Sequence, residues 1–139
     1  MKVLYKTRAS ATRGPDGQTS VSYGLLSVKL APPKELGGPG GATNPEQLFA
    51  AGYAACFLGA MKFVGNRDKI AVPADVSVTA EVGIGPRDDG GGFGITAALI
   101  VNLPGMDAAA AEDLMARAHV VCPYSHAIRG NVEVTTARA

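Results

Sequence analysis

Residues 43–64 read TNPEQLFAAGYAACFLGAMKFV, a run in which helix-start signals lead directly into an apolar segment. Asn44 can cap a helix that has Pro45 at its first position, or Thr43 and Glu46 can form a capping box. After this start the run is apolar on nearly every side, which is typical of a helix buried in a core. The stretch therefore predicts one unusually buried central helix.

A membrane span is the alternative interpretation of this helix. About twenty clean apolar residues are needed to cross a bilayer. The apolar run is shorter than that and contains Lys62. We therefore favour a core helix and expect no membrane partner.

The length and net charge of the chain limit its domain number and its possible partners. The 139 residues, 47% of them hydrophobic, are enough for a single domain over residues 1–139 with its own core. The formal net charge of +1 favours neither nucleic acid nor an acidic membrane surface as a partner. The first residues lack the pattern of a secretory signal, so we expect a cytoplasmic protein.

The rest of the chain reads as strands and one further helix. Val-, Thr- and Tyr-rich segments with partial alternation predict strands, and the alanine-rich segment before Pro123 predicts a helix. The glycine- and proline-rich residues 32–41 predict a long surface loop. The predicted order is β-β-α-β-β-α-β, an α+β fold with antiparallel sheet. The expected strands are residues 2–9, 20–30, 75–84, 93–103 and 131–136, and the expected second helix is 107–121.

Two cysteines could carry chemistry. They lie 66 residues apart, so neither a CxxC motif nor a zinc knuckle is present. Cys56 lies within the apolar helix, where a free cysteine often packs as a small hydrophobic residue. Cys122 lies at a helix end just before Pro123, a better position for reaching a pocket. The composition leaves open whether either thiol is reactive.

Two histidines near Cys122 raise further alternatives. His119 and Cys122 are three residues apart and share a helix face, which allows a metal site or a Cys-His nucleophile pair. A closed zinc site needs four ligands, and Cys56, Cys122, His119 and His126 are the only Cys and His residues available. A histidine near a helix C-terminus more often complements the helix dipole. We therefore expect no metal and no cofactor.

Four segments are informative when taken together: ELGG at 35–38, TNPEQLFAAGYAACF at 43–57, PAD at 73–75 and VCPYS at 121–125. They resemble the organic hydroperoxide resistance (Ohr) branch of the OsmC/Ohr family. The resemblance covers nearly the whole chain, and it implies an OsmC/Ohr-like fold in which antiparallel sheets wrap around two central helices in an intertwined homodimer. It also implies an organic hydroperoxide substrate, alkyl or fatty-acid, and a dihydrolipoyl protein or other dithiol as reductant.

The resemblance also implies a reaction for the two cysteines. A Cys56 thiolate would attack the outer oxygen of the peroxide, release an alcohol and become a sulfenic acid. Cys122 would then condense with that sulfenic acid to form a disulfide. The thiolate needs a nearby cation, and arginine suits this role because it stays charged when buried. By its match to the family motif, Glu46 would hold that arginine.

The first predicted turn departs from the family pattern. The family has Gly-Gly-Arg-Asp-Gly there, whereas this chain has RGPDG at 13–17, so Pro15 falls at the arginine's position. We expect Arg13 to substitute, because residues two apart on an extended strand project from the same face. Arg8 is the fallback, and the alternative for Arg13 is an exposed loop arginine.

The distance from Glu46 to Cys56 is a second difficulty. Ten residues of helix span about 15 Å, too far for one arginine to contact both. Either the helix breaks near Gly52 or the partner chain contributes, and we favour the partner chain. Two other functions remain as alternatives: a non-enzymatic small-molecule-binding or stress protein of the same fold, and a Cys-His hydrolase or metal binder.

Overall fold

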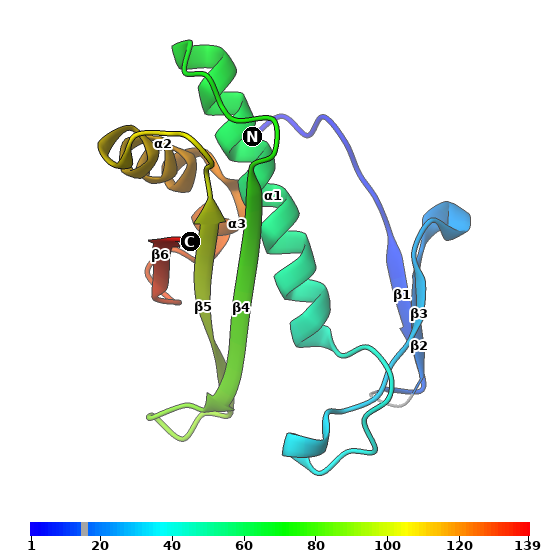
Figure 1. The fold of residues 1–139 in the computed structure, drawn as a ribbon. Coiled ribbons are helices and arrows are strands. Elements are labelled where there is room, and N and C mark those ends of the chain that lie inside the picture. The colour runs from blue at the N-terminus through cyan, green and yellow to red at the C-terminus, as the bar shows by residue number, and fades with distance from the viewer. Residues whose placement is uncertain (15–16) are drawn as a thin grey trace. The chain divides into compact units, whose positions relative to one another are not determined.

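The structure is a computed structural model that describes residues 1–14 and 17–139. The chain divides into two compact units, Met1–Leu48 and Phe49–Ala139, drawn in Figure 1. The long helix α1, Pro45–Asp68, starts in the first unit and continues through the second. That residues 1–139 form a single domain stays a prediction.

The first unit holds a small antiparallel sheet in the order β1-β2-β3. The prediction of two long strands here, residues 2–9 and 20–30, is wrong in its bounds. A 3-10 turn at Ser22–Gly24 interrupts the second strand, and both Tyr23 and Gly24 in it have a φ of 70°. The predicted surface loop contains a single 3-10 turn, Lys34–Leu36. The strands are β1 Ala9–Thr12, β2 Gln18–Val21 and β3 Ser27–Lys29.

Helix α1 begins where the sequence predicts. The Asn44 side chain accepts a hydrogen bond of 2.8 Å from the Gln47 backbone N–H, and the Gln47 side chain accepts one of 3.1 Å from the Asn44 N–H. This reciprocal pair satisfies two backbone donors at the helix start. The Asn44 cap with Pro45 at the first position is thus confirmed, and the Thr43–Glu46 box is wrong.

Helix α1 runs without interruption through Gly52, so the predicted alternative of a break there is wrong. One side of the helix is buried in the core of the second unit, including Tyr53, Phe57 and Val64. The prediction of burial on all sides is not met in this chain, because Phe63 is 57% exposed.

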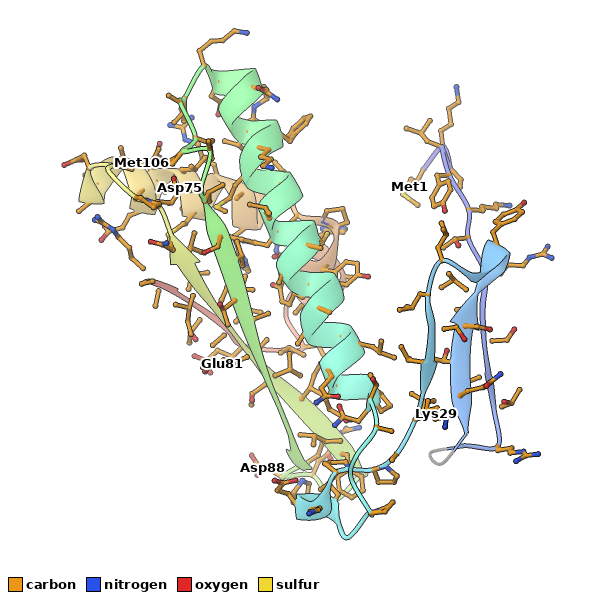
Figure 2. All side chains as sticks on the ribbon, turned by 45° about the vertical axis from the view of Figure 1, so that its right-hand side comes forward. Met1, Lys29, Asp75, Glu81, Asp88 and Met106 are labelled. Atoms are coloured by element: carbon orange, nitrogen blue, oxygen red, sulfur yellow. The ribbon has the colours of Figure 1, made fainter. Side chains whose placement is uncertain are left out.

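By length and composition α1 could also cross a membrane, with a mean hydropathy of 1.5 over an 18-residue window. In the second unit, however, it packs as a core helix along the sheet. Figure 2 shows the helix following β4 along its length, with Asp75, Glu81 and Asp88 marking successive points along that strand and its hairpin. A membrane span is therefore not indicated.

The second unit is built on a three-stranded sheet with the order β4-β5-β6. Strands β4, Ser77–Pro86, and β5, Phe93–Asn102, form the predicted antiparallel hairpin. Alternate residues of β5, such as Leu99 and Val101, are fully buried, so one face of the sheet carries the core. The last strand, β6, is Val134–Arg138 rather than 131–136, and it pairs with β5 in parallel. The α+β class is confirmed, and β6 is the exception to its antiparallel character.

Two helices lie between β5 and β6, one more than the sequence predicts. Helix α2, Ala108–Val121, is capped by the Asp107 side chain, which accepts a hydrogen bond from the Ala110 N–H at 3.2 Å. The additional helix α3, Pro123–Ile128, is only six residues long. Because it follows Cys122 directly, it sets the surroundings of that thiol.

Candidate functional site

The structure brings the two cysteines together. The Sγ atoms of Cys56 on α1 and Cys122 are 3.5 Å apart, although 66 residues separate them in the chain. Both are free thiols. Two sulfurs at this distance are in van der Waals contact and need to approach by only about 1.5 Å to reach a disulfide bond length.

Pro123 explains why Cys122 sits at a bend. A residue before proline avoids helical geometry, and Cys122 has an extended backbone with φ −63° and ψ 122°. Its N–H still donates to the Ala118 carbonyl at the end of α2, and its own carbonyl accepts from the His126 N–H at the start of α3, both at 2.9 Å. Cys122 therefore joins α2 to α3 with its backbone fixed on both sides.

The two thiols differ in accessibility. Cys122 is fully buried, whereas Cys56 is partly exposed. A molecule arriving from solvent therefore meets Cys56 first, with Cys122 behind it. This order argues against Cys122 as the nucleophile of a Cys-His hydrolase.

The surroundings of Cys56 act on its thiol in opposite directions. Burial raises the pKa of Cys56, the backbone N–H of Tyr124 lowers it by hydrogen bonding to the sulfur, and Cys122 raises it further. The net direction is upward. A reactive thiolate at this position therefore needs a further source of positive potential.

A buried hydroxyl pair joins the two segments that carry the thiols. The Tyr53 hydroxyl and the Ser125 Oγ are 2.8 Å apart and form a hydrogen bond. Tyr53 also belongs to an aromatic group with Phe49 and Tyr124, whose ring centroids are 5.9 to 6.1 Å apart. Burial raises the pKa of Tyr53, the bond with Ser125 lowers it, and the charges of Cys122 and Cys56 raise it further.

The histidines are not arranged as metal ligands. His119 packs against the ring of Phe57 with centroids 6.5 Å apart, and burial, together with Arg129, lowers its pKa. His126 is exposed on α3. Within residues 1–14 and 17–139, no group of three His, Cys, Asp or Glu side chains is placed to hold a metal ion.

The other predicted site residues lie in the first unit. Arg13 follows the end of β1 and lines a surface pocket together with Lys29. Its φ of 60° is left-handed, so the extended-strand argument for its direction is wrong. Pro15 lies outside the described residues. The roles of Arg13, of the fallback Arg8, and of Glu46 on the first turn of α1 toward Cys56 stay predictions.

Sequence reasoning missed three groups near the thiols: the Tyr53 hydroxyl, the Ser125 hydroxyl and the Tyr124 N–H. The Tyr53 hydroxyl had a signal in its spacing, since Tyr53 precedes Cys56 by three residues on one helix, and residues three apart on a helix share a face. The Ser125 hydroxyl had no such signal, because Cys122 has an extended backbone and lies between α2 and α3. The Tyr124 N–H had no signal, because it depends on the unpredicted helix α3.

Comparison with known proteins gives a consistent result. Residues 38–137 match the family described as OsmC-like protein. The chain is 54% identical over 139 residues to the organic hydroperoxide resistance protein of Xanthomonas axonopodis pv. citri, covering 99% of this chain and 96% of that one.

Solved structures agree with this match. A crystal structure of an organic hydroperoxide resistance protein from Legionella pneumophila superposes with a TM-score of 0.94 at 51% identity, covering 99% of both chains. OhrB of Bacillus subtilis does so with a TM-score of 0.89 at 37% identity, covering 99% of this chain and 100% of that one. The chain therefore belongs to the OsmC-like family and, within it, to the organic hydroperoxide resistance proteins.

Proposed function

We propose that this protein is a thiol-dependent peroxidase that reduces organic hydroperoxides to alcohols. The observation that carries the proposal is the 3.5 Å separation of the Cys56 and Cys122 sulfurs. The names of the relatives support the substrate class. The partly exposed rings of Phe49 and Tyr124 support it as well, since an apolar surface suits a peroxide with a hydrocarbon chain.

Cys56 is the attacking thiolate in this proposal. Its sulfur takes the outer peroxide oxygen, the O–O bond breaks, and the alkoxide leaves as the alcohol after taking up a proton. Cys56 is left as a sulfenic acid. Its partial exposure supports this assignment, because the peroxide has to reach it.

Cys122 is the resolving thiol. It attacks the Cys56 sulfur and forms the disulfide while the hydroxyl leaves as water. Burial of Cys122 supports this role, because a buried thiol is protected from reacting with peroxide itself. An external dithiol, for which we propose a dihydrolipoyl protein, would reduce the disulfide and complete the cycle.

Activation of Cys56 requires a cation, since burial raises the pKa of its thiol. We assign that role to Arg13, with Glu46 holding the guanidinium. Ten residues of continuous α1 separate Glu46 from Cys56, about 15 Å of helix rise. A partner chain that completes the site would remove this difficulty.

A homodimer is therefore part of the proposal. The exposed side of α1 carries an apolar strip of Ala55, Gly59 and Phe63, which follow one another at four-residue spacing. Such a face is suited to packing against the same helix of a second copy. We place the protein in the cytoplasm, where reduced dithiols are available.

Mass spectrometry after one equivalent of an alkyl hydroperoxide tests the function. The reduced protein should lose two mass units as the Cys56–Cys122 disulfide forms, and one equivalent of alcohol should appear. A chain that leaves the peroxide intact and keeps both thiols would contradict the proposal and favour a non-enzymatic binding protein of the same fold.

A further inference from the structure

The two cysteines are accompanied by a matching pair of hydroxyls. Tyr53 lies three residues before Cys56 on α1, and Ser125 lies three residues after Cys122 on α3. Their hydroxyl oxygens are 2.8 Å apart, and the side chains are 0% and 1% exposed. The same two segments are thus joined at two neighbouring points, once by sulfurs and once by hydroxyls.

The hydroxyl contact is the more directional of the two. A thiol is a weak hydrogen-bond donor and a weak acceptor, so the sulfur contact alone constrains the segments little. A buried hydroxyl without a partner loses its hydration and gains nothing in return. Sliding or rotating α3 against α1 would break the Tyr53–Ser125 bond at that cost, and the same motion would move Cys122 away from Cys56.

We propose that Tyr53 and Ser125 are positioning residues that hold the Cys122 thiol against Cys56 and thereby set the rate and the equilibrium of disulfide closure. The inference rests on the proposed function for its biological meaning. Neither hydroxyl touches the peroxide in this account.

The step that the pair controls is the second one of the cycle. The Cys122 sulfur donates an electron pair to the Cys56 sulfur, the S–S bond forms and the S–O bond of the sulfenic acid breaks. The hydroxide leaves with the thiol proton as water, and the oxidising equivalent is the one that the hydroperoxide delivered to Cys56. When closure is slow, the sulfenic acid persists and a second peroxide converts it to the sulfinic acid.

The test compares Tyr53→Phe, Ser125→Ala and the double variant in a glutathione redox buffer, with the disulfide fraction read by alkylation and mass spectrometry. The constant for disulfide formation should fall at least tenfold in each single variant. The double variant should fall no further than about the larger single effect, because both changes remove one bond. Tyr53→Phe keeps the ring, so it remains informative if Ser125→Ala does not fold.

Val101→Ala is the matched control, since it removes buried atoms of the same core from β5, a strand that carries neither cysteine. It should leave the disulfide constant within twofold of the parent despite its lower stability. Parent-like constants in both hydroxyl variants, or an equal fall in Val101→Ala, would overturn the proposal. In a separate peroxide assay, the hydroxyl variants should consume the first equivalent at the parent rate but accumulate sulfinic acid at Cys56.

The glutathione measurement contains no peroxide, so a failure of the positioning role can be distinguished from a failure of the proposed peroxidase function. A parent protein that ignores peroxides but shows the tenfold effect would refute the proposed function and keep the positioning role. A parent protein that reduces peroxides, with variants whose constant for disulfide formation is unchanged, would support the proposed function and refute the positioning role.

Discussion

The ring of Tyr124 lies against Gly52 of α1. A Cβ built at position 52 would be 3.1 Å from the Tyr124 hydroxyl oxygen and 3.2 Å from its Cε2 atom. Hydrogen bonding from the backbone of the same Tyr124 lowers the pKa of Cys56, one turn further along the helix. The missing side chain of Gly52 is thus what lets this residue of α3 approach the cysteine-bearing helix.

Gly52→Ala should separate stability from reactivity. Alanine is favoured over glycine inside a helix by about 1 kcal/mol. Displacement of the partly exposed Tyr124 ring offsets that gain, so we expect urea unfolding to change by no more than about 1 kcal/mol. The Tyr124 N–H should move from the sulfur, and the midpoint of Cys56 alkylation should therefore rise to higher pH.

The control for this variant is Gly52→Ala in a Tyr124→Ala background. With the ring removed, the alanine should raise the free energy of unfolding by about 1 kcal/mol and leave the alkylation midpoint of that background unchanged. A large stability loss in both backgrounds would show that the obstacle at position 52 is not the Tyr124 ring.

Substitution of the two cysteines should impair peroxide reduction in different ways. Cys56→Ser should abolish peroxide reduction, because the attacking sulfur is gone. Cys122→Ser should consume about one equivalent and then accumulate oxidised Cys56, measured as added oxygen by mass spectrometry. Sustained turnover in Cys56→Ser would instead support chemistry centred on Cys122.

Arg13→Ala tests the source of the positive potential. Loss of the cation should raise the pKa of Cys56 and slow peroxide reduction at neutral pH by a factor of ten or more, since one pKa unit is about 1.4 kcal/mol. The readout is the pH profile of alkylation together with the peroxide rate. Arg87→Ala, in the exposed β4–β5 turn, is the control and should match the parent. An unaltered profile in Arg13→Ala, with normal turnover, would make Arg13 a bystander.

The acid stability of the protein should depend on Asp68. Hydrogen bonds and charge from Arg67, and then from Arg117, lower the pKa of Asp68 from 3.8 to about 2. A lowered carboxyl pKa stabilises the folded state fully above the unfolded value and loses that effect as pH falls toward the folded value. The contribution should therefore disappear between about pH 4 and pH 2, and added salt should weaken it.

Asp68→Asn should remove this part of the pH dependence, measured by urea unfolding at pH 6 and at pH 3. The comparison is Asp113→Asn, which removes the half-exposed carboxylate that pairs with Arg117 at 2.8 Å. Asp113→Asn should still lose free energy of unfolding between pH 4 and pH 2, as the parent does. Equal curves for the two variants would contradict a specific role of Asp68.

Oligomeric state tests the exposed face of α1. We expect the parent protein to be a dimer in light scattering, and Phe63→Glu to be a monomer with less peroxide activity, because a charge would be buried in the contact. Phe93→Glu is a matched control, since Phe93 is 69% exposed against 57% for Phe63. A monomeric parent protein with full activity at nanomolar concentration would contradict the shared site.

The parts of the fold that follow from local chemistry could be read from the sequence. Asn44 and Pro45 mark the start of α1 because capping depends on neighbouring residues alone. The apolar residues of 93–103 mark a strand for the same reason, and the burial of alternate residues in β5 is seen in the structure. The pairing of Cys56 with Cys122 came from the resemblance, and no spacing rule could supply it.

The parts that depend on distant contacts could not be read. Tyr23 adopts a positive φ that is unusual for a residue other than glycine, so nothing local marked the end of β2. Helix α3 is too short to be stable alone and is held by its surroundings, including the Tyr53–Ser125 bond across 72 residues. The parallel pairing of β6 with β5 depends on the path of α2 and α3, which connect the two strands.

The proposed cycle would also change how strongly the chain is restrained, because Cys122 lies between two helices and would be linked covalently to a third. A bond from Cys122 to Cys56 would close a covalent ring that contains β4, β5 and α2. Closing a loop of this length restricts the unfolded chain by about 4 kcal/mol in the loop-entropy treatment. The oxidised protein would melt at a higher temperature than the reduced one, and each reduction by a dithiol would release that restraint. The fraction of protein that melts at the higher temperature would then measure the fraction that is still oxidised.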